Sequence, residues 1–164
     1  MRALFIGGIK SGKSKNAEEY ILKLYNEKPI YLATNEFFDA EMQTRVEKHK
    51  EQRGESFLTI EEPLKLYDVI SKQNKPVLVE CVSMWINNML YHSHTQEEIF
   101  QELEKIATLK NDTLFVINDV SCSVVSDNAL VRKFVDLNGL VAHYLAKHCD
   151  EVYNTVAGIS VKIK

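Results

Sequence analysis

Eight residues near the start of the chain have the types and the spacing that bind a phosphate group. They run Gly7-Gly8-Ile9-Lys10-Ser11-Gly12-Lys13-Ser14, directly after the apolar residues 3–6. Glycines let the backbone wrap a phosphate, and a helix that begins near Gly12 adds its positive N-terminal end. Lys13 can reach the terminal phosphates, and the Ser14 hydroxyl suits Mg²⁺. The pattern predicts a loop that binds a nucleoside triphosphate with Mg²⁺, in preference to an ordinary glycine-rich turn.

Alternating helices and buried strands predict the fold that positions this loop. The expected strands are residues 3–6, 30–33, 57–60, 77–80 and 113–117, with a final pair at 151–157 and 159–163. The expected helices are residues 14–24, 38–52, 64–70, two stretches between 83 and 109, and 129–147. This order implies a mainly parallel sheet with helices on both faces, and Gly158 between the last two strands implies an antiparallel hairpin. We expect an α/β fold of the P-loop NTPase-like (RecA-like) class.

The composition limits the size class and the partners of the chain. With 164 residues and 45% hydrophobic content, we expect a single nucleotide-binding domain over residues 1–164. A formal net charge of −3 without long like-charged blocks argues against nucleic-acid binding by general electrostatics. We also expect a cytoplasmic protein. It should have no membrane span, because no apolar run approaches ~20 residues, and no cleavable signal, because the N-terminus runs straight into a strand and the phosphate-binding loop. Cys81, Cys122 and Cys149 lack CxxC spacing and are expected to be free thiols.

Polar residues at the ends of the predicted strands are candidates for the site, because ligands bind beyond the carboxyl ends of parallel strands. They are Thr34 and Asn35 after Ala33, then Glu61, Glu80 and the pair Asn118-Asp119. Glu80 could orient Mg²⁺ or cap the next helix. Glu61 could belong to the site or to an acidic surface turn before Pro63. Asn118-Asp119 fits helix capping and nucleotide contact equally well.

Most histidines and cysteines have unremarkable sequence surroundings. His92 and His94 flank a serine in a polar junction with no cysteine or carboxylate partner nearby, so we interpret them as solvated loop residues. Cys81 follows a buried strand and fits a small core residue better than a nucleophile. His49, taken by itself, is an exposed histidine on a charged helix.

Further segments carry a resemblance that runs from end to end. They are Tyr31 to Thr34, Asp39 to His49, Thr59 to Leu64, Val79 to Leu90, and Ala157 to Ile159 with the final Lys164. Together with the phosphate loop, they make the chain resemble the bifunctional adenosylcobinamide kinase / adenosylcobinamide-phosphate guanylyltransferase family of cobalamin nucleotide-loop assembly. Phosphate loops occur in many unrelated enzymes, whereas the Arg-x-x-x-His helix and the segment Trp85 to Leu90 are far more specific.

The resemblance implies two reactions. ATP or GTP phosphorylates the aminopropanol hydroxyl of adenosylcobinamide, and GMP from GTP is then attached to that phosphate through a guanylylated histidine. His49 resembles that histidine, and its imidazole can attack the α-phosphorus of GTP while Mg²⁺ and Lys13 stabilise the departing pyrophosphate. Arg45, one helical turn earlier, could bind a phosphate, orient the imidazole partner or pair with Glu41.

The resemblance also implies surroundings for the nucleotide and an assembly. Besides the phosphate loop, the expected nucleotide-binding residues are Ala33, Thr34, Asn35, Lys50, Glu51, Gln52, Arg53, Glu61 and Glu80. The expected metal ligands are Ser14 and Glu80. The family further implies a homo-oligomer, a trimer, with the nucleotide site near a subunit boundary.

The last third of the chain departs from the family pattern. Two glycines, a proline, two arginines and an amide pair are replaced, and the positions now hold Ser121, Ser123, Ser126, Val135, Leu140, Ala142 and His143. If the lost groups hold the corrinoid or a phosphate, its binding weakens by a few kcal/mol. Three functions therefore stay open: the bifunctional enzyme, a single-function or divergent kinase or guanylyltransferase with a changed acceptor, and a non-catalytic nucleotide-binding module.

Overall fold

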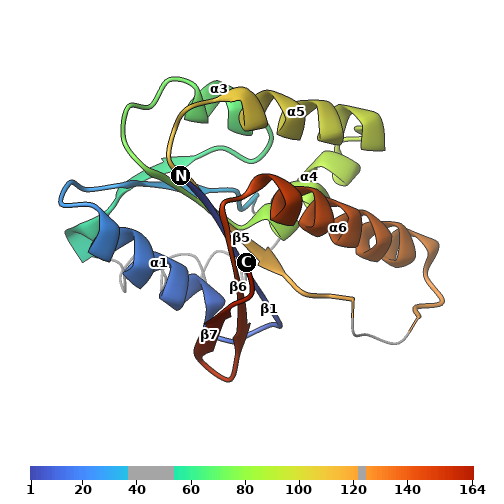
Figure 1. The fold of residues 1–164 in the computed structure, drawn as a ribbon. Coiled ribbons are helices and arrows are strands. Elements are labelled where there is room, and N and C mark those ends of the chain that lie inside the picture. Colours follow the sequence, from blue (N-terminus) through green and yellow to red (C-terminus); the bar gives the residue numbers. More distant parts are fainter. Residues whose placement is uncertain (37–53, 122–124) are drawn as a thin grey trace.

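The structure is a computed structural model that describes residues 1–36, 54–121 and 125–164. Its centre is a seven-stranded sheet in the order β3-β2-β4-β5-β1-β6-β7 (Figure 1). The strands are β1 (Arg2–Gly7), β2 (Ile30–Ala33), β3 (Leu58–Glu61), β4 (Val77–Glu80), β5 (Thr113–Asn118), β6 (Glu151–Val156) and β7 (Ile159–Lys162). Every pairing is parallel except β6 with β7, which confirms the expected parallel sheet and closing hairpin.

The described helices also follow the predicted order. They are α1 (Lys13–Leu24), α3 (Leu66–Ile70), α4 (Val82–Tyr91), α5 (Gln96–Thr108) and α6 (Ala129–His148), with a short 3₁₀ turn, η1 (Gly54–Ser56). The predicted helix over residues 38–52 lies outside the described residues. Among the helices described, none is long and apolar enough to cross a membrane.

Helices cover both faces of the sheet, as predicted. Because side chains alternate along a strand, β1 sends Leu4 to one face and Phe5 to the other. Phe5 joins a cluster with Ala17 and Ile21 of α1, whereas Leu4 joins a larger cluster built on α3, α4, α5 and α6. Figure 1 shows this division, with α1 on one side of the strands and the other helices on the opposite side. Both faces of the central strands are therefore buried, which explains their nearly continuous apolar sequences.

Small shifts at element ends have local causes. The third strand begins at Leu58, one residue later than predicted, because Phe57 turns in to pack edge-on against Tyr31 with ring centroids 5.6 Å apart. Helix α3 begins at Leu66. Just before it, the Glu62 carboxylate accepts hydrogen bonds from the backbone N–H groups of Leu64 and Lys65, both at 2.9 Å, and holds a turn.

Strand register brings the predicted site residues to one edge of the sheet. Ala33 of β2 is paired with Glu61 of β3 and with Glu80 of β4, while Gly7 of β1 is paired with Asn118 of β5. All are at or near the carboxyl ends of parallel strands, where ligands bind in sheets of this kind. The loop after β1 therefore opens onto the same edge as Glu80.

Candidate nucleotide site

The loop between β1 and α1 has the backbone conformation that its sequence predicts. Lys10 and Gly12 have positive φ angles of 58° and 94°, and the Ser11 N–H donates to the Gly8 carbonyl at 3.2 Å. A Cβ on Gly7 would lie 2.4 Å from the Thr155 carbonyl oxygen, so this position has no room for a side chain. The glycines thus let the chain turn tightly between strand and helix, and the free N–H groups of the first turn of α1 lie at its end.

Lys13 crosses the loop that precedes it. Its side chain is largely buried, with 7% of the residue exposed, and Nζ donates to the Gly8 carbonyl at 3.3 Å. An ammonium group has three protons to donate, so this contact leaves capacity for phosphate oxygens. The lysine is held over the loop as a point charge before any ligand binds.

Ser14 and Glu80 meet at the head of the helix. The Ser14 hydroxyl donates to Glu80 Oε1 at 2.8 Å across a gap of 66 positions in the sequence. A hydroxyl and a carboxylate are hard oxygen ligands of the kind that Mg²⁺ takes, and Mg²⁺ usually needs few protein ligands because it keeps waters and phosphate oxygens. Although the described residues form no cluster of three or more His, Cys, Asp or Glu around a metal position, this pair fits a magnesium ion brought by a nucleotide.

Helix capping is not the role of Glu80. The N-cap of α4 is Cys81, whose Sγ accepts a hydrogen bond from the Met84 N–H at 3.4 Å. Burial, reinforced by the neighbouring Glu80 carboxylate, raises the pKa of the Cys81 thiol to about 12. Cys81 is therefore a neutral capping residue at neutral pH, and it is half-buried instead of being the core residue that the sequence favoured.

Thr34 is fully buried beneath the edge rather than on its surface. Its hydroxyl donates to the Cys81 carbonyl at 2.8 Å and accepts from the Cys81 N–H at 2.9 Å. The Thr34 N–H in turn donates to the Glu80 carbonyl at 3.0 Å. Thr34 therefore fixes the backbone on both sides of the Glu80–Cys81 peptide.

Asn88 of α4 is a residue that the sequence patterns did not single out. Its fully buried amide donates to the carbonyl of Thr34 at 2.7 Å and to that of Pro63 at 3.1 Å. One turn earlier, the Trp85 indole N–H donates to the Leu64 carbonyl at 2.8 Å. One helix face thereby holds the ends of β2 and β3 together. The sequence identified the Trp85 to Leu90 segment as specific to the family. It did not show which of these residues bond to the segments that follow β2 and β3.

The polar end of β5 is structural in the described residues. Ser83 Oγ donates to Asn138 Oδ1 at 2.7 Å and accepts from the Asn118 N–H at 2.9 Å, while Asn138 Nδ2 donates to the Asn118 carbonyl at 2.9 Å. The Asp119 carboxylate accepts from the N–H of Ser121 at 3.0 Å and from its hydroxyl. Asp119 therefore caps a turn and not a helix, since the N-cap of α6 is Asn128, and nucleotide contact by Asn118-Asp119 stays a prediction.

The remaining predicted residues divide between the edge and the undescribed segment. Glu61 is the last residue of β3 and is exposed. Asn35, directly after Thr34, is half-buried. The predicted residues His49, Lys50, Glu51, Gln52 and Arg53, together with Arg45, lie outside the described residues.

The expectation that no carboxylate stands near His92 and His94 was wrong. Folding brings Glu36 to His92, with 2.8 Å between Oε2 and Nε2, and Glu98 lies one helical turn from His94, with 3.3 Å between Oε2 and Nδ1. Glu36 is distant in sequence, which is why its approach was not foreseen. The pairs remain at the protein surface, and the described residues hold no metal-binding cluster there.

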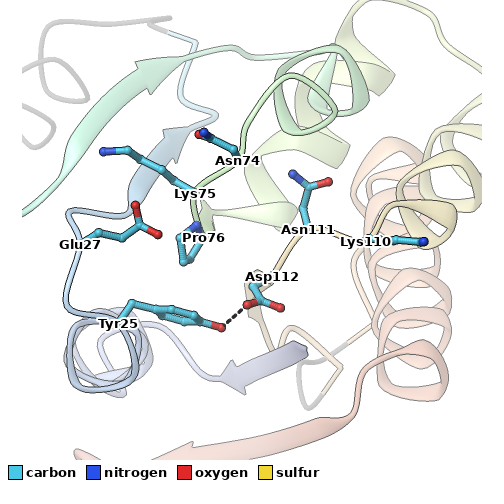
Figure 2. A pocket seen from close by; sticks show the side chains of 8 residues that line it. All are labelled: Tyr25, Glu27, Asn74, Lys75, Pro76, Lys110, Asn111 and Asp112. Carbon is cyan, nitrogen blue, oxygen red and sulfur yellow. Dashed lines mark hydrogen bonds between the residues drawn. The ribbon is translucent and has the colours of Figure 1, made fainter.

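A pocket opens at the opposite edge of the sheet (Figure 2). It is lined by Tyr25, Glu27, residues 74–76 and residues 110–112, which precede β4 and β5 or follow α1. Within it, the Tyr25 hydroxyl donates to Asp112 at 2.7 Å. This pocket lies at the amino ends of the strands, so it is separate from the nucleotide site.

Comparison with known proteins places the whole chain in one family. The family model of cobinamide kinase / cobinamide phosphate guanyltransferase matches residues 3–163. The bifunctional adenosylcobalamin biosynthesis protein CobU of Escherichia coli (strain K12) is 32% identical over 183 aligned residues, covering 100% of both chains. The bifunctional adenosylcobalamin biosynthesis protein CobP of Pseudomonas aeruginosa is also 32% identical, covering 100% of this chain and 98% of its own.

The solved structure of the flagellar accessory protein FlaH from Methanocaldococcus jannaschii aligns with 98% of this chain and 75% of that chain, with a TM-score of 0.49 and 11% identity. The family match covers nearly all of this chain, and the phosphate loop, Ser14 and Glu80 lie within it. This chain belongs to the cobinamide kinase / cobinamide phosphate guanyltransferase family.

Proposed function

We propose that this chain carries out both reactions of its family on one acceptor. It transfers the γ-phosphoryl group of ATP or GTP to the aminopropanol hydroxyl of adenosylcobinamide, and then transfers GMP from GTP to the new phosphate. The observation that carries this proposal is the phosphate loop with Lys13 across it and Ser14 bonded to Glu80 at 2.8 Å. The relatives that match over their full length are named as bifunctional proteins of adenosylcobalamin biosynthesis.

In the phosphoryl transfer, the backbone N–H groups from Gly12 to Ser14 hold the phosphates of the donor. Lys13 places its charge on the terminal phosphate oxygens, where negative charge shifts as the γ-phosphoryl group leaves. Glu80 accepts from Ser14 and so fixes the hydroxyl rotamer at the head of the helix. Ser14 and Glu80 would hold a magnesium ion, which supplies charge neutralisation at the phosphate oxygens.

In the guanylyl transfer, we assign the nucleophile to His49. The neutral imidazole forms a bond from nitrogen to the α-phosphorus of GTP, and the bond to the pyrophosphate oxygen breaks. Lys13 is placed to stabilise the departing pyrophosphate. The phosphate of the acceptor then attacks the same phosphorus and releases the imidazole, which yields adenosylcobinamide-GDP. For the nucleotide we keep the predicted neighbours Ala33, Asn35, Lys50, Glu51, Gln52, Arg53 and Glu61 as contacts, and Thr34 as the residue that holds the backbone beside Glu80.

A labelling experiment tests the covalent step. Purified protein incubated with [α-³²P]GTP and Mg²⁺ should gain a label that is labile in acid and stable in base, as a phosphoramidate is. His49→Ala should abolish the label. His143→Ala, which removes an exposed histidine of α6, should leave it unchanged. Labelling that survives His49→Ala would reject the assignment of the nucleophile.

The acceptor is tested separately because residues 121–143 depart from the family pattern. Phosphoryl transfer to adenosylcobinamide at a rate comparable with turnover of GTP supports the corrinoid acceptor. Transfer to another hydroxyl compound in place of adenosylcobinamide would point to the changed-acceptor function. GTP binding without any transfer would point to the non-catalytic module.

We also propose that the chain forms a homo-oligomer, a trimer, as the family resemblance implies. Sedimentation equilibrium should then give three times the 18.8 kDa mass of the chain. A particle with the mass of one chain across the micromolar range would contradict this assembly.

A further inference from the structure

The hairpin that closes the chain folds back against the phosphate loop. Strands β6 and β7 are joined by Ala157 and Gly158, whose φ angles are 50° and 84°. Two successive positive φ angles are typical of the tight two-residue turns that connect antiparallel strands. The turn therefore has a defined shape and presents its backbone groups in fixed directions.

The hairpin turn makes a direct hydrogen bond to the loop. The Gly158 N–H donates to the Ser11 carbonyl at 2.7 Å. In a trans peptide, the C=O of one residue and the N–H of the next point to opposite sides. Because the Ser11 carbonyl is turned toward the hairpin, the Gly12 N–H is turned away from it, toward the side on which phosphates bind.

The glycines of the loop fit closely against the hairpin backbone. A Cβ on Gly12 would lie 3.1 Å from Gly158 Cα, and a Cβ on Gly7 would lie 2.4 Å from the Thr155 carbonyl oxygen. The hairpin is thus a wall along the outer side of the loop. The loop cannot shift outward without displacing the hairpin.

Asn16, in the first turns of α1, fixes the hairpin turn in place. Its Nδ2 donates to the Gly158 carbonyl at 3.0 Å and to Ser160 Oγ at 2.8 Å. Ser160 Oγ also lies 2.7 Å from Thr155 Oγ1, so the amide joins both strands of the hairpin to the helix. These bonds connect the phosphate loop, the helix after it and the end of the chain at one point.

We propose that Asn16 is a positioning residue for the phosphate donor, which acts through Gly158 to hold the Ser11–Gly12 peptide in its anion-binding orientation. This inference rests on the proposed function of the loop. Asn16 need not touch the nucleotide, since its amide is already engaged with the hairpin. Its loss frees the hairpin turn, and the peptide then spends part of its time with the Gly12 N–H misdirected.

The experiment measures binding of two probes, Mg·GTP and inorganic tripolyphosphate, by calorimetry. Asn16→Ala and Asn16→Leu both remove the amide donor, and Leu keeps the branched shape of the side chain. We expect each to weaken both probes by a similar factor of about ten, because the defect lies at the phosphates and not at the base. The KM for the nucleotide should rise by a similar factor while the KM for the acceptor stays constant.

Asn74→Ala is the matched control, because Asn74 lies at the pocket on the opposite edge of the sheet (Figure 2). It should leave both affinities unchanged. Ser160→Ala keeps the Asn16 bond to Gly158 and should weaken binding less than Asn16→Ala. The ligand-free melting temperature separates a binding defect from unfolding: the Asn16 variants should melt within a few degrees of the wild type.

Two results would overturn the proposal in distinguishable ways. If the wild type and both Asn16 variants bind tripolyphosphate equally, Asn16 does not position the loop, although the proposed function stands. If the wild type binds neither probe, the proposed function fails and this inference fails with it. A loss of GTP affinity with unchanged tripolyphosphate affinity would also reject the proposal, since it would place the effect at the base.

Discussion

At the scale of single residues, the site depends on pairs that the fold brings together. Ser14 lies in the first turn of α1, and Glu80 ends a strand in the middle of the chain, yet their oxygens lie 2.8 Å apart. Strand β4 fixes the backbone position of Glu80, which is its last residue. Thr34 holds the Glu80–Cys81 peptide that follows through hydrogen bonds. A hydroxyl and a carboxylate held this way need little rearrangement to accept a metal ion with its waters.

Replacing Glu80 by its neutral isostere tests the metal role. Glu80→Gln keeps an oxygen that can accept from Ser14 but removes the negative charge. We expect the Mg²⁺ concentration for half-maximal turnover to rise at least about tenfold, as is typical when a charge-assisted contact is lost. Turnover measured against Mg²⁺ concentration gives this value. Glu19→Gln on the outer face of α1 is the control, and equal Mg²⁺ dependence in the two variants would count against the assignment.

Among the secondary-structure elements, α4 fixes the segments that follow the carboxyl ends of β2 and β3. Asn88 and Trp85 bond to backbone carbonyls that follow β2 and β3, so a single helix face fixes two loops. The sequence predicted that helix and the neighbouring strands from their apolar periodicity, because burial of one face imposes a regular pattern. The sequence could not predict the partners of Asn88, because a hydrogen bond to a carbonyl far away in the sequence produces no periodic pattern of residue types.

Asn88→Ala should destabilise the protein by about 1–3 kcal/mol, because it leaves buried carbonyls of Thr34 and Pro63 without their donor. Urea unfolding followed by circular dichroism measures the change. Asn87→Ala removes the exposed neighbour on the same helix and should change the free energy of unfolding by less than about 0.5 kcal/mol. Equal effects at the two positions would show that the buried bonds contribute little.

Glu151 links the closing hairpin to α1, and its contribution to stability depends on pH. Glu151 of β6 accepts from Lys162 at 2.5 Å, from the Tyr20 hydroxyl, and from the Tyr153 hydroxyl at 2.9 Å. The Lys162 bond, followed by the Tyr20 bond, lowers the pKa of Glu151 from 4.5 to about 2. A depressed pKa in the folded state means that this contribution to stability is present above pH 4.5 and is lost as the pH falls toward 2.

The melting temperature should therefore drop between pH 5 and pH 2 more steeply in the wild type than in Glu151→Gln. Thermal melts recorded across that range give the two slopes. The variant should melt lower than the wild type at pH 7, and the two curves should approach each other near pH 2. If the melting temperatures of the two proteins change in parallel over the whole pH range, the ionised Glu151 carboxylate is not stabilised by Lys162 and the two tyrosines.

At the scale of the whole molecule, the two edges of the sheet have different roles. The phosphate loop, Glu80 and the buried hydrogen bonds of Thr34 lie at the carboxyl ends of the strands. The polar pocket of Figure 2 lies at their amino ends. The order of strands and helices along the chain and the helices on both faces followed from local patterns, since each strand is short, apolar and flanked by turn residues. The contact between the closing hairpin and the phosphate loop did not, because it joins residues at opposite ends of the chain.

In the proposed function, one phosphate loop serves both transfers to a corrinoid acceptor, and identification of the corrinoid products tests this proposal. Purified protein is incubated with Mg·GTP and adenosylcobinamide, and the corrinoid products are separated and identified by mass. We predict adenosylcobinamide phosphate followed by adenosylcobinamide-GDP. Lys13→Ala should reduce both by at least about a hundredfold, while Lys15→Ala, on the exposed face of the same helix, should make both at the wild-type rate. Unchanged adenosylcobinamide alongside bound GTP, or product formation that survives Lys13→Ala, would contradict the proposed function.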